Sequence, residues 1–155
     1  QMRDMTSLYG EEWPRNYSSE DLGSQYVPDL LARFNLSRDE LFSLFDYCHQ
    51  KKIIPLCTPW DPISVEALEA YGIEAFKIAS ADLTNHMLIE QIAKTGKPII
   101  LSTGMSRELE IIESVDLVQK LAAPLVLLHC NSTYPPDTKD VNLRYMDRLF
   151  SLVIA

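Results

Sequence analysis

The sequence predicts an α/β fold in which parallel strands alternate with helices, specifically part of a (β/α)8 barrel. Short apolar runs begin near residues 53, 76, 98, 125 and 152, and the spacing of about 22 to 27 residues leaves room for one helix between successive strands. The runs are apolar throughout, as expected of parallel strands covered on both faces. Each of the four complete runs ends in polar residues, and a barrel draws its site from the ends of all its strands. An open doubly wound sheet is less favoured, since no Gly-x-Gly-x-x-Gly follows a strand.

Two segments are predicted along the chain. Residues 1–36 show no sustained apolar period and are expected to form an irregular N-terminal excursion, with at most a short helix over 28–34. Residues 37–155 carry the strand–helix pattern and are expected to form the partial barrel. The sequence stops inside an apolar run, which is unusual for a natural domain, so we expect a fragment truncated at both ends.

The first regular helix is predicted to begin at Ser37, because Ser37 and Glu40 form a capping box. Its apolar stripe consists of Leu41, Leu44, Phe45 and Cys48. A short buried strand is expected over 53–57. The next helix is predicted between Asp61 and Gly72, residue types typical of a helix start and a helix end.

Three further pairs of a strand and a helix are predicted from similar patterns of apolar runs and capping residues. Strands are predicted over 76–80, 98–101 and 125–130, and a fifth strand over 152–155. The intervening helices are expected to begin at Thr84 or Asn85, at a capping Ser106, and at Asp140.

Composition excludes several classes of partner. The chain has 22 Asp and Glu residues against 14 Lys and Arg, a formal net charge of -8, so nucleic acid is not an expected partner. The apolar runs are far shorter than the roughly 20 residues that a bilayer requires, so no membrane span is expected. An odd set of three cysteines without a Cys-x-x-Cys motif, and no leader, favours a reducing cytoplasm.

Lys77 is the most informative single residue, because it lies within an apolar strand. A lysine there either reaches solvent from the strand edge or places a cation in the barrel mouth, and we favour the second interpretation. Such a cation would hold a phosphate or form a Schiff base. Short hydroxyl residues follow the strands and, with Lys77 and the sharp turn that Gly104 allows, would form an anion pocket: Thr58, Ser80, Ser102 and Thr103.

Other polar residues near strand ends have two interpretations each. Asp82 is a candidate general base or acceptor of a sugar hydroxyl. Asn85 is equally well interpreted as a helix cap. His129 is more typical of a core histidine than of a metal ligand, because no second histidine falls at ligand spacing, so no metal ligand is assigned. Tyr134 precedes two prolines and either forms an aromatic wall or ends the strand.

Several collinear motifs resemble the bacterial N-acetylneuraminate (sialic acid) synthase family. They are FKIASADLTN at 76–85, KTGKP at 94–98, LSTGM at 101–105, LHCNSTYP at 128–135 and DVNLR at 140–144. Motifs that recur in order with fitting spacing are more specific than one short pattern.

The resemblance implies a (β/α)8 barrel that condenses phosphoenolpyruvate with an N-acetylated amino sugar, N-acetylmannosamine in the founding case. The products are a nine-carbon 2-keto sugar acid and phosphate. It also implies a divalent cation, Mn²⁺ or Mg²⁺, whose ligands lie outside this chain, so this chain alone is not expected to catalyse the reaction. Five strands of a barrel leave two open sheet edges, so self-association into a homo-oligomer is expected.

The resemblance assigns roles to individual residues. Lys77 and Asp82 would be catalytic, with Asp82 standing where the family usually has Glu. Phosphoenolpyruvate would be bound by Ser80 and Ser102 together with Lys77, with Thr58 beside them. Asn85 is a further candidate for substrate binding, and Ser132 and Tyr134 would line the sugar side.

Departures from the family pattern leave the sugar open. Besides Asp82, Ala81 replaces a common Gly, Ser132 a common Asn and Trp60 a common Phe. Legionaminate and pseudaminate synthases share the scaffold and the chemistry. A Schiff-base aldolase using Lys77 and a non-catalytic barrel module are the alternatives from other classes.

Overall fold

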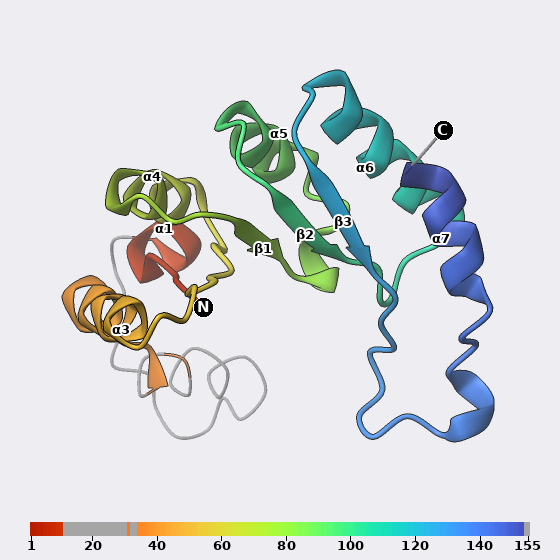
Figure 1. Cartoon of the computed structure of the whole chain (residues 1–155), viewed down its shortest axis with the longest axis horizontal. Coiled ribbons are helices and arrows are strands. Elements are labelled where there is room, and N and C mark those ends of the chain that lie inside the picture. The colour runs from red at the N-terminus through yellow and green to blue at the C-terminus, as the bar shows by residue number, and fades with distance from the viewer. Residues whose placement is uncertain (11–30, 32–33, 154–155) are drawn as a thin grey trace.

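The computed structural model describes residues 1–10, 31 and 34–153. Its centre is a parallel sheet of three strands, β1 (Phe76–Ile78), β2 (Ile99–Ser102) and β3 (Leu125–Leu128), in the order β1-β2-β3. Each strand therefore pairs with the next one along the chain. Figure 1 shows helices α4 (Pro62–Tyr71), α5 (His86–Lys94) and α6 (Glu108–Lys120) in succession along one side of this sheet. This arrangement is a section of a (β/α)8 barrel, as predicted.

Two isolated parallel bridges continue the pairing beyond β1. Cys57 pairs with Phe76, and Met2 pairs with Pro59. The Met2 N–H donates to the Thr58 carbonyl at 2.9 Å, and the Trp60 N–H donates to the Met2 carbonyl at 3.1 Å. The chain near Met2, the chain at 57–59 and the three strands thus lie side by side in chain order.

The two faces of the sheet differ in burial. Phe76, Ile78, Ile99 and Leu101 are fully buried and belong to the core formed with the helices. Lys77, Ile100 and Val126 are in register on the opposite face, where Val126 is 52% exposed. Because the helices cover only the first face, the second is the one that a closed barrel encloses. Lys77 therefore faces the barrel interior.

The remaining helices are α1 (Met5–Tyr9), α3 (Arg38–Gln50) and α7 (Tyr145–Val153), with short 3-10 helices η1 (Ser80–Asp82) and η2 (Thr138–Asp140). The capping box of α3 is confirmed, since the Ser37 N–H donates to the Glu40 carboxylate and the Glu40 N–H to the Ser37 hydroxyl. Gly72 ends α4 with a φ of 91°, a left-handed conformation that glycine adopts readily.

Asp61 joins α4 to the N-terminal segment. Its carboxylate accepts hydrogen bonds from the backbone N–H and the hydroxyl of Ser64 and from the backbone N–H of Asp4, all at 2.8 Å. The predicted cap at Asp61 is therefore confirmed, and the same side chain also fixes the start of the chain against the barrel.

Two predictions near the N-terminal side are wrong. Residues 1–10 are not irregular, because the Met2 bridge orders the chain and Asp4 caps α1 by accepting from the Ser7 N–H at 2.7 Å. The rest of the expected excursion and most of the expected helix over 28–34 lie outside the described residues. The strand expected over 53–57 pairs only at Cys57, and Ile53, Ile54 and Leu56 are exposed because no described segment covers them.

Three boundaries farther along also differ from the predictions. Arg107, not Ser106, is the N-cap of α6, and the Ser106 hydroxyl instead donates to the Gly104 carbonyl at 3.1 Å. The helix expected from Asp140 begins only at Tyr145, because Asn142 has a left-handed φ of 49° that interrupts a helix. Residues 152 and 153 form the last turn of α7 instead of starting a strand, and 154–155 lie outside the described residues.

No helix in the described part of the chain is both long enough and apolar enough to span a membrane.

Residues 1–155 on their own are expected to self-associate. Val126 on the edge strand β3, and Met146 and Phe150 on α7, are each more than half exposed. Burying such surface is favourable by about 25 cal/mol per Å². Size-exclusion chromatography with light scattering should give a mass at least twice 17.7 kDa. A monomer of 17.7 kDa that unfolds cooperatively would contradict this expectation.

Candidate functional site

Lys77 and Ser102 bring a cation and a hydroxyl together at the ends of two paired strands. The Lys77 ammonium donates to the Ser102 hydroxyl oxygen at 2.6 Å and to the Ile78 carbonyl at 2.7 Å. One of the three ammonium protons has no acceptor among the described residues, and the Ser102 hydroxyl keeps its own proton to donate. Burial lowers the pKa of Lys77 below the ordinary lysine value.

A second group of hydroxyls converges at Gly104, in the loop that follows β2. The Gly104 N–H donates to the Ser80 hydroxyl oxygen at 3.0 Å. A Cβ atom on Gly104 would lie 2.7 Å from the Ser132 Oγ and 2.9 Å from the Ser80 Oγ. The missing side chain therefore lets hydroxyls from the ends of β1 and β3 approach the loop after β2. Their protons and that of Ser102 form, with Lys77, a set of donors suited to an oxyanion.

Asp82 lies at the end of η1, beside this donor set. It is 8% exposed, and its Oδ1 atom accepts a hydrogen bond from the Asn85 side-chain amide at 3.1 Å. Its Oδ2 atom is buried and has no hydrogen-bond partner among the described residues. Asn85 also caps α5, because its side-chain oxygen accepts from the Leu88 N–H at 3.3 Å. Asn85 thus has a capping role and orients Asp82.

Arg3 and Trp60 complete the neighbourhood of Asp82. The Arg3 guanidinium carbon lies 4.6 Å from the centre of the Trp60 ring, a cation–π contact. Burial lowers the pKa of Arg3, and the negative charges of Tyr9 and Asp82 act in the opposite direction. The indole Nε1 of Trp60 is also buried, and no described residue accepts a hydrogen bond from it. Sequence reasoning gave Arg3 no role, because it treated 1–36 as irregular; the neighbouring Asp4, a good helix cap, was the available signal.

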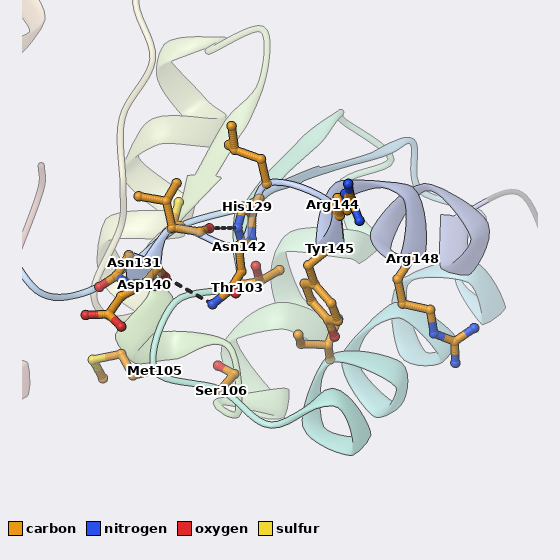
Figure 2. A pocket seen from close by; sticks show the side chains of 14 residues that line it. Thr103, Met105, Ser106, His129, Asn131, Asp140, Asn142, Arg144, Tyr145 and Arg148 are labelled. Carbon is orange, nitrogen blue, oxygen red and sulfur yellow. Dashed lines mark hydrogen bonds between the residues drawn. The ribbon is translucent and has the colours of Figure 1, made fainter. Parts of the chain in front are cut away.

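A cavity of about 790 Å³ lies beyond the end of β3, between the loop that follows it and the start of α7. Figure 2 shows its lining, which includes Thr103, His129 and Tyr145. The His129 Nε2–H donates to the Val141 carbonyl at 2.7 Å, which gives this histidine a structural role. Arg148 in the same lining is paired with Glu108 at 2.7 Å. This cavity adjoins the Lys77 group without including Lys77.

The other candidate residues differ in their burial and position. Thr58 is buried and directly follows Cys57, whose carbonyl accepts a hydrogen bond from the Lys77 backbone N–H at 3.0 Å. Tyr134 is 96% exposed in the loop after β3 and does not line a wall in this structure. The described residues hold no group of three His, Cys, Asp or Glu side chains close enough to bind a metal ion.

Comparison with known proteins gives consistent matches. The model of the NeuB family matches residues 1–152. An uncharacterized protein of Methanocaldococcus jannaschii is 41% identical over 142 residues, which are 89% of this chain and 42% of that protein. The N,N'-diacetyllegionaminic acid synthase of Campylobacter jejuni is 42% identical over 106 residues, which are 65% of this chain and 32% of that enzyme.

A solved structure is similar over nearly the whole chain. The N-acetylneuraminic acid (sialic acid) synthetase from Leptospira borgpetersenii, in complex with citrate, superposes with a TM-score of 0.84 at 30% identity. The match covers 97% of this chain and 49% of that chain. This chain therefore spans less than half the length of each of these three relatives.

Proposed function

This chain belongs to the NeuB family, and from that premise we propose that it is part of a sugar-acid synthase. The enzyme would condense phosphoenolpyruvate with an N-acetylated amino sugar, N-acetylmannosamine or a relative, to give a nine-carbon 2-keto sugar acid and phosphate. The observation that carries the proposal is the group of Lys77, Ser102, Ser80 and Gly104 at neighbouring strand ends.

Phosphoenolpyruvate is a small anion with a phosphate and a carboxylate. The free ammonium proton of Lys77 and the hydroxyl protons of Ser102 and Ser80 would donate to these oxygens. Short charge-assisted hydrogen bonds of this kind are stronger than neutral ones. Because the donors are held in place before the ligand binds, little reorganisation is needed as charge shifts toward the leaving phosphate.

The reaction forms one carbon–carbon bond and breaks one carbon–oxygen bond. C3 of phosphoenolpyruvate attacks the aldehyde carbon of the open-chain sugar, and the aldehyde oxygen takes up a proton. Water adds at C2 and loses one proton, which forms a new C2–O bond. The bond between C2 and the phosphate oxygen then breaks as the new hydroxyl loses its second proton to become the keto group, and the leaving phosphate takes up that proton. Asp82, whose Oδ2 is free of protein partners in the described region, would accept a proton on this side of the site. Ser132, which lies with Ser80 at Gly104, would contact the sugar where it meets phosphoenolpyruvate, and Tyr134 would contact it from the exposed loop after β3.

The family resemblance also implies Mn²⁺ or Mg²⁺, which would polarise the sugar aldehyde when bound. The described residues do not fit such an ion by themselves, since no three suitable side chains come together. From the family resemblance, we propose that its ligands come from outside this chain. The three free cysteines support a reducing compartment, and we propose the cytoplasm.

The test is turnover by the intact enzyme, meaning this chain with whatever sequence flanks it. Phosphoenolpyruvate, Mn²⁺ and a panel of N-acetylated amino sugars are supplied in ¹⁸O-labelled water. We expect phosphate release with at least one sugar, with the label in the keto acid and none in the phosphate. The accepted sugar distinguishes sialic acid from legionaminic or pseudaminic acid synthesis. No phosphate release with any sugar would contradict the proposal and favour a non-catalytic module.

A Schiff-base aldolase is the second candidate. It is favoured by the lowered pKa of Lys77, because a lower pKa leaves a larger fraction of the side chain as the neutral amine that attacks a carbonyl. Borohydride reduction in the presence of pyruvate separates the two. A covalent adduct on Lys77 would support the aldolase. We expect none, because the ammonium is held by the Ser102 hydroxyl and the Ile78 carbonyl.

A further inference from the structure

Two buried side-chain polar atoms in the described part of the chain lack a hydrogen-bond partner. They are the Nε1 of Trp60 and the Oδ2 of Asp82. Burying a polar atom without a partner is unfavourable, and such atoms are rare in folded proteins. When they gather at a site, a bound ligand is a natural source of the missing partners.

The two atoms belong to neighbouring strand ends. Trp60 directly follows the bridged segment 57–59, and Asp82 ends η1, which directly follows β1. The bridge between Cys57 and Phe76 places these two segments side by side. Both residues therefore follow strand ends on the side of the sheet where Ser102 ends β2 and accepts a hydrogen bond from Lys77.

Arg3 couples the two side chains. Its guanidinium stacks on the Trp60 ring at 4.6 Å and is attracted by the charge of Asp82. The stacking restricts the indole ring, so its N–H direction is set before a ligand arrives. Compared with a phenylalanine, Trp60 adds a hydrogen-bond donor without removing the aromatic surface.

We infer that Trp60 determines sugar specificity by donating its indole N–H to an oxygen of the sugar substrate, while Asp82 Oδ2 accepts from a sugar hydroxyl. An indole N–H only donates and an ionised carboxylate only accepts, so together they match a ligand rich in hydroxyl and acylamino groups. Phosphoenolpyruvate, an anion, would not be drawn to the Asp82 carboxylate, so it remains with Lys77. The inference rests on the proposed function and assigns the sugar to the Trp60 side of the site.

The test removes the indole N–H and keeps the ring. The intact enzyme is made as Trp60→Phe and, by site-specific incorporation, with benzothienylalanine at position 60, which keeps the size of tryptophan. We expect the KM for the sugar to rise about tenfold in both, which corresponds to about 1.4 kcal/mol, with the KM for phosphoenolpyruvate unchanged. The unmodified enzyme and the two altered enzymes are then assayed with a series of sugars that each lack one hydroxyl. For one of these sugars, the one that lacks the oxygen bound by the indole N–H, we expect the same KM in all three enzymes.

Calorimetric titration of the sugar alone supplies a readout that does not depend on turnover. A KM for the sugar that is unchanged in the benzothienylalanine enzyme would overturn the inference and leave the proposed function intact. An equal rise in both KM values would also overturn it, because a general distortion would then explain the effect. If the unmodified enzyme neither binds nor converts any sugar of the panel, the proposed function and this inference both fail.

Discussion

Lys77→Met is expected to lower kcat/KM for phosphoenolpyruvate by about a hundredfold to a thousandfold in the intact enzyme. The ammonium is the only cation that the described residues bring to the Ser102 hydroxyl, and removing one donor that stabilises developing charge commonly costs this much. Methionine keeps the length and the apolar contacts of the lysine stem, so the loss should come from the charge. Steady-state kinetics with phosphate detection measures it.

Lys97→Met is the matched control. Lys97 is also a half-buried lysine whose ammonium donates to a backbone carbonyl, that of Ile73 at 2.6 Å, but it precedes β2 and lies at the opposite end of the strand. We expect Lys97→Met to keep kcat/KM within about threefold, since a distant lysine adds little to binding of a screened anion. Equal losses in the two variants would contradict the assignment of Lys77 to phosphoenolpyruvate.

The pKa of Lys77 also predicts the direction of a pH effect. Because burial lowers this pKa, the ammonium loses its proton at a lower pH than an exposed lysine does. The KM for phosphoenolpyruvate should therefore rise on the alkaline side before the ordinary lysine pKa is reached. In Lys77→Met this alkaline rise should disappear, which a pH series of KM for both enzymes can measure.

Local signals in the sequence predicted the repeated part of the fold well. Capping residues such as Ser37, Asp61 and Asn85 act over three or four residues, and all three cap helices as expected. The wrong predictions concern segments whose structure depends on a strand partner far away in the sequence or on an unusual backbone conformation. Residues 53–56 have the composition of a strand but no described partner, and the left-handed Asn142 delays a helix whose apolar stripe begins earlier.

The residues of the candidate site also separate into those that the sequence predicted and those that it did not. Strand-end position was enough to predict that Lys77 lies near Ser102 and that Ser80 lies near the loop after β2, because parallel strands in register bring their carboxyl ends together. It could not predict Arg3, which reaches Trp60 only through the pairing of Met2 with Pro59. Nor could it separate Asn85 as a ligand from Asn85 as a cap, since the same residue type serves both purposes.

Gly104→Ala is expected to raise the KM for phosphoenolpyruvate by about tenfold to a hundredfold while the protein stays folded. The new methyl carbon would lie 2.7 Å from the Ser132 Oγ and 2.9 Å from the Ser80 Oγ, closer than such atoms can approach. Both obstacles are ends of serine side chains, which can rotate away at small cost. The clash should therefore be relieved by displacing the hydroxyls from the anion site, and misplaced donors of this kind reduce binding and rate strongly.

Two measurements separate this local displacement from a general disturbance of the loop. Ser106→Ala removes the hydroxyl that donates to the Gly104 carbonyl at 3.1 Å, so it perturbs the same loop without adding volume near Ser80. We expect Ser106→Ala to keep its KM for phosphoenolpyruvate and Gly104→Ala to keep its thermal midpoint within a few degrees. If Gly104→Ala unfolds at a much lower temperature, or if Ser106→Ala loses affinity to the same extent, the hydroxyls at Gly104 are not the donors that hold the anion. If Gly104→Ala is stable and specifically weak for phosphoenolpyruvate, then the close approach of three strand ends, which only glycine permits here, is what assembles the site.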